Sequence, residues 1–60
     1  MPMPGDRVRV MFRDGNVIEG KLLGYYIKFF IYVYAVIELD NSKRVHVCVN
    51  DATVECFETI

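Results

Sequence analysis

The residues best suited to chemistry are an arginine, a histidine and a cysteine that alternate along one short segment, RVHVC. Side chains at alternate positions of a strand share one face, so Arg44, His46 and Cys48 could bind a ligand together. No metal site is expected, because zinc needs three or four ligands and Cys56 is the only other soft one. No nucleophile–base pair is expected either, since strand side chains at i and i+2 run parallel and nothing orients His46 as a base.

The other charged residues show no spacing that is typical of a catalytic site. No two carboxylates are placed as an acid–base pair, and the glycines are spread over turns and a strand rather than gathered in a phosphate-binding loop. We therefore expect no catalytic residue and no cofactor. Arg7, Arg9 and Met11 alternate as an outward stripe, which we interpret as a solvated strand face with cross-strand pairs rather than a phosphate site. The carboxylates that show no acid–base spacing are scattered over the expected strand ends: Glu19, Glu38, Asp40, Glu55 and Glu58.

Six of the eight aromatic residues fall in one segment, GYYIKFFIYVYAVIEL, residues 24–39. Read as a strand with a period of two, its odd positions are mostly apolar and its even positions are still largely aromatic. A strand with one face on a core needs only one apolar face. We predict that the even face is a homo-oligomeric interface; the alternatives are a coiled strand buried on both faces and a surface that stacks bases or another ligand. The predicted interface residues are Tyr26, Phe30, Tyr32, Tyr34 and Val36.

Strands must position these residues, because nothing in the sequence has the 3.6-residue period of a long helix. Asp14-Gly15, between the first two alternating segments, is a strong hairpin turn. Gly20 and Gly24 mark bends or close backbone approach in the second strand. Asn50 or Asp51 would cap one helical turn before the last strand. The expected strands are residues 7–12, 17–26, a third that ends near 39, 44–49 and 54–58.

These elements predict an all-β fold, a small five-stranded SH3-like barrel with one helical turn before the last strand. Residues 1–5 would form an extended N-terminal arm and residues 6–60 the barrel domain. A chain of 60 residues makes one domain and buries only roughly 60% of its unfolded surface, so its core is marginal. Small folds of this kind often add oligomerisation.

Charge and cysteine content limit the partners and the compartment. The net charge of −1 argues against a nucleic-acid partner, because binding phosphate needs a basic patch. Two cysteines do not make a secreted disulfide framework, so we expect reduced thiols in a cytoplasmic protein. No signal peptide is visible, and the longest apolar run is too short to span a bilayer, so no membrane partner is expected.

Two families resemble parts of this sequence. VRVMFRDGNVIEGKLLG, residues 8–24, looks like the first half of the Sm motif, with its alternating strand, Asp-Gly turn and Gly-x-Leu. Members of the Sm-like family read RNA with an Asp and an Asn further along, and those places fall near Tyr26 and Phe30 here. The resemblance therefore covers about a third of the chain and implies the hairpin without the family's ligand-binding residues.

The second resemblance, over most of the chain, is to the plasmid-borne type II dihydrofolate reductases. It is carried by GDRVR at 5–9, Gly20 with LGYY at 23–26, YAV at 34–36, and RVHVCV before a last VE. That family implies an SH3-like barrel in a homotetramer, in which nicotinamide cofactor and dihydrofolate stack in a central pore against a Val-Gln-Ile-Tyr segment. The matching segment here is residues 45–48, with His46 at the place of the Gln and Cys48 at the place of the Tyr.

The residues and the resemblances together predict a self-associating binding module with no catalysis of its own. Its partners would be further copies of itself and, at Arg44, His46 and Cys48, a protein or small-molecule ligand. One alternative is an enzyme of the type II reductase kind, with a site that forms only at the centre of the oligomer around His46. The other is an Sm-like nucleic-acid-binding protein.

Overall fold

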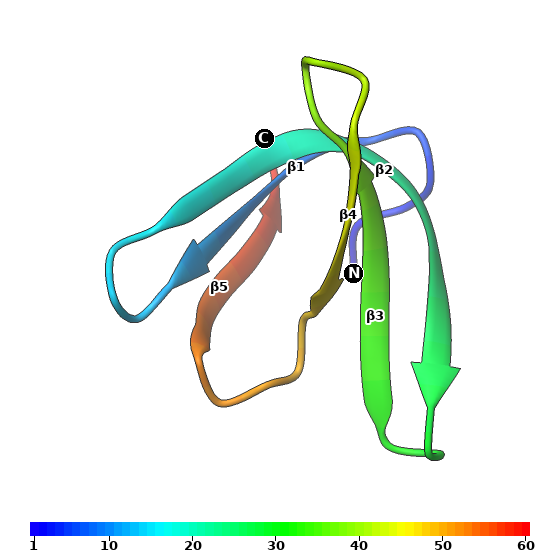
Figure 1. The fold of residues 1–60 in the computed structure, drawn as a ribbon, viewed down its shortest axis with the longest axis vertical. Coiled ribbons are helices and arrows are strands. Elements are labelled where there is room, and N and C mark those ends of the chain that lie inside the picture. Colours follow the sequence, from blue (N-terminus) through cyan, green and yellow to red (C-terminus); the bar gives the residue numbers. More distant parts are fainter.

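The computed structural model describes all 60 residues and contains five antiparallel strands and no helix. The strands form one sheet in the order β4-β3-β2-β1-β5 (Figure 1), so each hairpin neighbour in sequence is a neighbour in space and β5 returns to pair with β1. The predicted all-β fold with five strands is therefore confirmed. The strands are β1 (Arg7–Phe12), β2 (Val17–Lys28), β3 (Tyr32–Glu38), β4 (Arg44–Cys48) and β5 (Val54–Thr59).

The first hairpin follows from simple alternation and a strong turn. Val8 and Val10 are fully buried on one face of β1, while Arg7 lies on the other face. The turn is at Gly15, whose φ of 93° is a conformation that glycine adopts without steric cost. Asp14 stabilises the turn by accepting a hydrogen bond of 2.9 Å from the main chain of Asn16. The predicted Asp-Gly turn is confirmed.

Strand β2 is long and strongly curved, and it pairs with β1 at its start and with β3 at its end (Figure 1). Its curvature requires a close approach at Gly20, where an added Cβ would lie 2.8 Å from Cγ2 of Ile37. Past the bend, the pairing with β3 shifts by one residue between Leu22 and Gly24. Such a bulge moves the following side chains to the opposite face, so Tyr25 lies on the core side and Tyr26 outside.

The aromatic segment is not one strand, which corrects the prediction for residues 24–39. Three residues, 29–31, reverse the chain between β2 and β3. Phe29 and Phe30 have φ values of 52° and 66°, the signs of a type I′ turn, and the Ile31 N–H donates to the Lys28 carbonyl at 3.2 Å. The sequence shows no turn here because neither position holds the usual Asn or Gly.

The connection between β4 and β5 consists of turns, and the predicted helical turn is not confirmed there. It contains two hydrogen bonds between residues three apart, from Asp51 N–H to the Cys48 carbonyl at 3.3 Å and from Val54 N–H to the Asp51 carbonyl at 3.1 Å. The Asp51 carboxylate also accepts a hydrogen bond of 3.1 Å from the Thr53 main chain. The hydrogen bond from the Thr53 hydroxyl lowers the pKa of the Asp51 carboxyl most, and this main-chain bond lowers it further. Asp51 thus does organise the turn, but no helix follows it.

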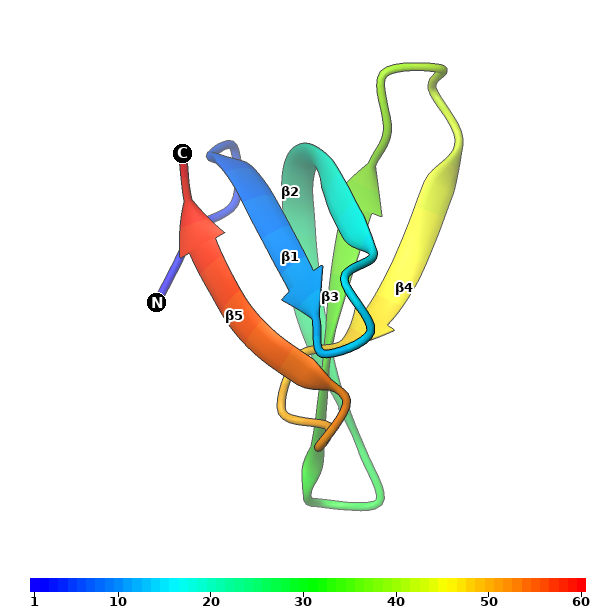
Figure 2. The ribbon, with the colours of Figure 1, turned by 90° about the vertical axis from the view of Figure 1, so that its left-hand side faces the viewer.

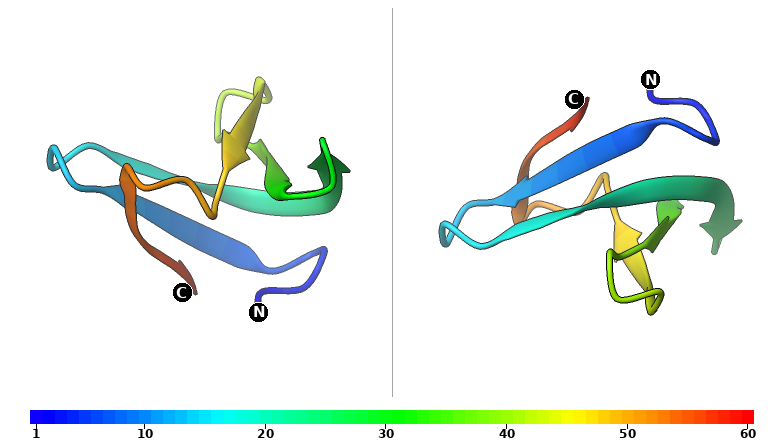
Figure 3. Two further views of the ribbon diagram at one scale, coloured as in Figure 1. Left: turned by 90° about the horizontal axis from the view of Figure 1, so that it is seen from below. Right: turned by 90° about the horizontal axis from the view of Figure 1, so that it is seen from above.

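Side chains from all five strands meet in one core. Its fully buried part is small, and the second half of β2 contacts β5 across it, where the rings of Tyr25 and Phe57 meet edge to face at 6.3 Å. The Tyr25 hydroxyl donates to the carbonyl of buried Pro2 at 2.6 Å, which ties the N-terminal residues to the core. Both termini lie on the same side of the molecule (Figures 2 and 3). The buried apolar residues are Val8, Val10, Leu22, Ala35, Ile37 and Val47.

No helix in the structure has the length and apolar character needed to cross a membrane.

Candidate functional site

The outer surface of β2, β3 and β4 carries a group of ring side chains in mutual contact. Tyr26 pairs with Tyr34 across the hairpin, and their rings stack 5.1 Å apart with an angle of 5° between planes. The Tyr26 hydroxyl shares a hydrogen bond of 2.8 Å with Nδ1 of His46 on β4. Val36 and Cys48 lie opposite His46 and Tyr34 in the β3–β4 register, so they belong to the same surface. We call these five residues the aromatic face.

The aromatic face joins two sets of residues that were predicted separately. Tyr26, Tyr34 and Val36 came from the predicted interface, whereas His46 and Cys48 came from the predicted ligand-binding group. They converge because β3 pairs with β2 on one side and with β4 on the other. The sequence alone could not show this, since alternation identifies the face of each strand but not the strand beside it.

Basic side chains stand at both ends of the aromatic face. Lys28, on β2, places its Nζ 5.6 Å from the centre of the Tyr34 ring, within the range of a cation–π contact. Tyr32 pairs with Lys28 at this end, while Arg44 pairs with Glu38 at the other end. Tyr32, from the predicted interface, and Arg44, from the predicted ligand-binding group, therefore flank the aromatic face.

Two predicted interface residues lie outside the aromatic face: Tyr32 flanks it, and Phe30 lies in the turn. Phe30 is 99% exposed, beside Phe29 at 76% and Ile31 at 62%. Ile27 and Tyr32, which flank the turn, are also exposed. We call residues 27–32 the hairpin tip; it projects from the body of the molecule at the end of the β2–β3 hairpin (Figure 1).

Asn50 holds the hairpin tip in place and was not predicted to do so. Its side-chain oxygen accepts a hydrogen bond of 3.0 Å from Val33 N–H, and its amide nitrogen donates to the Ile31 carbonyl at 2.7 Å. The Cys48 thiol also donates to the Asn50 oxygen at 3.2 Å. The side-chain amide of Asn50 thus makes the two hydrogen bonds that the main chain of a neighbouring strand would make beside the start of β3. The sequence offered only its turn-forming tendency, which suggested a helix cap instead.

The hydrogen bonds of the aromatic face separate its histidine from its cysteine. Nδ1 of His46 is bonded to the Tyr26 hydroxyl, and the Cys48 thiol is bonded to Asn50. The His46 ring therefore does not activate the thiol as a general base would. What the surface offers is a flat stack of rings, a histidine ring, and cations at its edges. Such a surface can pack against apolar or planar groups.

The other cysteine lies at the far end of the sheet and is poorly suited to nucleophilic chemistry. Cys56, on β5, is half-buried, and both cysteines are free thiols. Burial raises the pKa of the Cys56 thiol, and the nearby carboxylate of Glu58 raises it further. Because the pKa is raised, the fraction of Cys56 present as thiolate at neutral pH is below that of an ordinary thiol. The thiolate is the reactive form of cysteine.

We predict that Cys56 reacts slowly with iodoacetamide and that Glu58→Gln accelerates it. Removing the carboxylate charge lowers the thiol pKa and raises the thiolate fraction at pH 7–8. Peptide mass spectrometry over a time course would measure the Cys56 rate, with Asp14→Asn as a control that removes a distant charge. Equal rates in the unmodified protein and in Glu58→Gln would contradict the electrostatic account. Failure of both thiols to react without reductant would reveal a disulfide.

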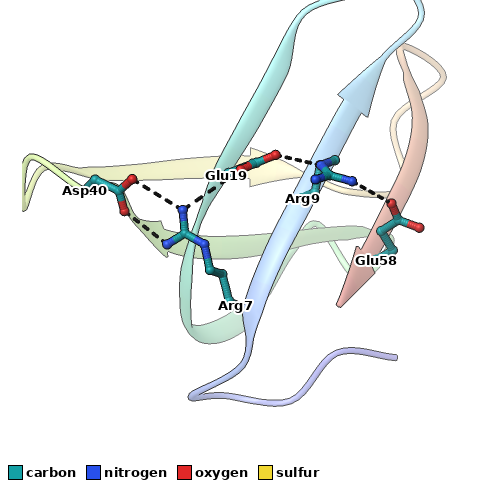
Figure 4. Close-up of polar contacts among 5 residues, drawn as sticks. All are labelled: Arg7, Arg9, Glu19, Asp40 and Glu58. Atoms are coloured by element: carbon teal, nitrogen blue, oxygen red, sulfur yellow. Dashed lines mark hydrogen bonds and ion pairs between the residues drawn. The ribbon is translucent and has the colours of Figure 1, made fainter. Parts of the chain in front are cut away.

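The outer surface of β1, the start of β2 and β5 is charged rather than aromatic. Arg9 contacts Glu19 at 2.7 Å and Glu58 at 3.5 Å, and Arg7 contacts Asp40 at 3.0 Å (Figure 4). The Arg7 guanidinium holds the pKa of the Asp40 carboxyl below its ordinary value. The Arg9 pairs with Glu19 and Glu58 are the cross-strand pairs predicted for this face, whereas Asp40 lies between β3 and β4. Exposed pairs of this kind add little stability. Both arginines are occupied by carboxylates and do not form a free phosphate site.

No group of three or more His, Cys, Asp and Glu side chains is arranged to hold a metal ion. In comparisons with known proteins, no family model, curated protein or solved structure matches this chain. The class that fold and surface define is a small all-β domain with a five-stranded antiparallel sheet and a partly exposed aromatic face. The resemblances to the Sm-like proteins and to the type II reductases stay predictions.

Proposed function

We propose that this chain is a small SH3-like barrel that self-associates through the hairpin tip and the aromatic face, and acts as a binding module without catalysis of its own. The barrel is supported by the strand order, by the curved β2 that pairs with β1 and then with β3, and by a core shared among all five strands. A curved, bulged strand of this kind is how small barrels turn a corner.

The observation that carries self-association is the exposure of consecutive apolar residues at the hairpin tip. Phe29, Phe30 and Ile31 are each more than 60% exposed, although all three are strongly apolar. Contiguous apolar surface on a small protein marks an interaction site, and aromatic residues are enriched at the centres of interfaces. The aromatic face adjoins the tip through Tyr32 and Lys28, so the two surfaces can be covered by one partner.

The magnitudes allow a stable contact between copies. Complete burial of a phenylalanine contributes about 1.5–3 kcal/mol, and a twofold contact would bury Phe29 and Phe30 from each copy. Four such rings contribute about 6–12 kcal/mol in total. Association itself costs an estimated 4–15 kcal/mol in lost freedom of motion. The two ranges overlap, so the four rings come close to balancing that cost by themselves, and burial of Tyr32 at the tip and Tyr34 on the aromatic face would add to the favourable side.

The test is the molar mass in solution and its change on substitution. Light scattering at about 10–200 μM should give a mass above the 7.0 kDa of one chain, and Tyr34→Lys should lower it towards one chain. Val17→Lys is the matched control, because Val17 is an exposed apolar residue of β2 that lies outside both surfaces. A mass of one chain at every concentration would reject the proposal, as would equal dissociation by the control.

The same protein should be tested for other partners of these surfaces. A monomer that floats with phosphatidylcholine–phosphatidylserine vesicles would assign the hairpin tip to a lipid surface instead. A monomer that binds an oligonucleotide with an affinity that falls steeply with salt would favour the Sm-like function. Oxidation of a nicotinamide cofactor in the presence of dihydrofolate would favour the reductase. The charged pairs of Arg7 and Arg9 leave fewer free cations for phosphate than the sequence suggests.

A further inference from the structure

Strand β4 is an edge of the sheet, and its outer main-chain groups have no partner strand. It pairs only with β3. The Val49 N–H donates to the Val33 carbonyl at 2.9 Å, and the Leu39 N–H donates to the Lys43 carbonyl at 2.8 Å. Both bonds use odd-numbered residues of the segment that contains β4. Because main-chain groups of successive residues point to opposite sides of a strand, the even residues, centred on His46, direct their N–H and C=O groups away from β3.

A surface depression runs along this edge. It is lined by four successive residues of β4, from Val45 to Cys48, together with Phe12, Ile18 and the 51–53 turn. Side chains of successive strand residues alternate between the two faces of a sheet. Because all four residues line the depression, it lies beside the strand, between β4 and the first hairpin. The free N–H and C=O groups of His46 open beside it.

The edge also lacks the usual protection. Exposed edge strands are normally blunted by proline, by a bulge or by several charged side chains. The β3–β4 register is regular from Tyr34 to Glu38, β4 contains no proline, and Arg44 is its only charged residue. The opposite edge differs, because β5 carries Glu55 and Glu58 and its pairing with β1 is interrupted by a register shift. The outward carbonyl of Cys48 accepts the Asp51 N–H at 3.3 Å, whereas the outward groups of Arg44 and His46 have no main-chain partner. Unpaired main-chain groups of this kind are a template for another strand.

We propose that β4 pairs antiparallel with β4 of a second copy across a twofold axis at His46. In this register the two His46 residues oppose each other, Arg44 opposes Cys48 of the partner subunit, and Val45 opposes the partner's Val47. Every pair is compatible in charge, and the valines meet on the core side. A twofold contact of this kind is the commonest symmetry of homo-oligomers. It would place two aromatic faces side by side on one continuous sheet.

This inference rests on the proposed self-association and names a contact distinct from the hairpin tip and the aromatic face. It makes a covalent prediction. Residues directly opposite across such a pair have Cα atoms about 5.5 Å apart, within the range that a disulfide can bridge. Arg44→Cys should therefore form a disulfide with the native Cys48 of the partner under mild oxidation. The same two residues of one chain lie roughly 13 Å apart along the strand and cannot bridge.

The cross-linking experiment has a matched control on the neighbouring strand. Glu38 pairs with Arg44 but lies one strand in from the edge. Arg44→Cys should give a covalent dimer whose 44–48 link is found by mass spectrometry, whereas Glu38→Cys should give no link to Cys48. Equal yields in both variants, or a ladder of larger species from Arg44→Cys, would overturn the twofold pairing.

A second pair of variants tests the main chain alone. His46→Pro removes both the imidazole and the outward N–H, whereas His46→Ala removes only the imidazole. Proline is tolerated on an edge strand where its nitrogen faces outward. His46→Pro should raise the dissociation constant of the assembly at least about tenfold relative to His46→Ala. If the unmodified protein assembles but the two variants dissociate equally, the β4 contact is wrong while self-association stands. If the unmodified protein is monomeric at every concentration, both the β4 contact and the proposed self-association are wrong.

Discussion

Replacing Phe29 by Asn and Phe30 by Gly should stabilise the single chain and weaken its self-association at the same time. Both phenylalanines have positive φ values, a conformation that costs an L-residue with a bulky side chain about 1–2 kcal/mol. Asn-Gly is the pair that type I′ turns prefer. The double substitution should therefore raise the free energy of unfolding by about 2 kcal/mol, which corresponds to roughly 8–16 °C in melting temperature for a domain of this size.

The control must remove the rings without relieving the backbone. Phe29→Ala with Phe30→Ala removes the same apolar surface but still places a Cβ at two positive φ positions. We expect the alanine pair to weaken association as the Asn-Gly pair does, but without the gain in stability. Unfolding should be measured by denaturant titration at a few micromolar, where association contributes least. Equal stability of the Asn-Gly and alanine variants would show that the turn is unstrained.

A strained turn with exposed phenylalanines points to selection for contact rather than for stability. Local strain persists where the surrounding structure enforces it, and it gathers at functional positions. Here Asn50 supplies that enforcement through its bonds to Ile31 and Val33. The two phenylalanines satisfy neither the turn nor the core, which is the physical reason for the proposal that a second copy covers them.

Much of the fold could be predicted because alternation and turn residues agree along most of the chain. Val8 and Val10 on β1, and Val47 on β4, lie on the core side as the period of two indicates. The turn at Gly15 was visible because only a few residue types accept its backbone conformation. Where local signals and tertiary structure agree in this way, sequence patterns are sufficient.

The β2–β3 turn could not be predicted, yet its consequence for the aromatic residues was small. Nothing from Tyr25 to Leu39 is a turn-forming residue, so the segment resembles one strand. Three residues connect Lys28 with its partner Tyr32, and even residues therefore pair with even residues, as Tyr26 does with Tyr34. Most of the predicted even face survives as one surface for this reason, whereas Phe30, inside the turn, leaves it.

The contribution of β4 to the aromatic face depends on strand order, which local patterns do not contain. Tyr34 meets Cys48, and Tyr26 reaches His46, only because β3 lies between β2 and β4. The role of Asn50 is hidden for the same reason, since its partners are 17 and 19 residues away. Long-range pairing of this kind has to be observed in the structure.

The bend in β2 leads to the second large prediction, a severe loss of stability in Gly20→Ala. A Cβ at this position would lie 2.8 Å from Cγ2 of Ile37 and still closer to the main-chain oxygen of Glu38. Real Cβ atoms essentially never approach so closely, so the backbone would have to move. Overpacking a core costs about 1–3 kcal/mol and occasionally more. We expect the upper end of that range, because a carbonyl in the β2–β3 pairing cannot rotate away as a side chain can.

Gly24→Ala provides the matched control on the same strand. No atom lies within 4 Å of a Cβ built at Gly24, and its φ is outside the left-handed region. This variant should be as stable as the unmodified protein, or more stable by about 0.4–1 kcal/mol, because alanine restricts the unfolded chain. Thermal and denaturant unfolding of the two variants would compare them directly. Equal effects at Gly20 and Gly24 would mean that the close approach of β3 to β2 does not determine the bend. A loss confined to Gly20 would show that β2 can curve because this position carries a hydrogen atom in place of a methyl group. That bend then determines how the aromatic half of the sheet is oriented relative to the charged half.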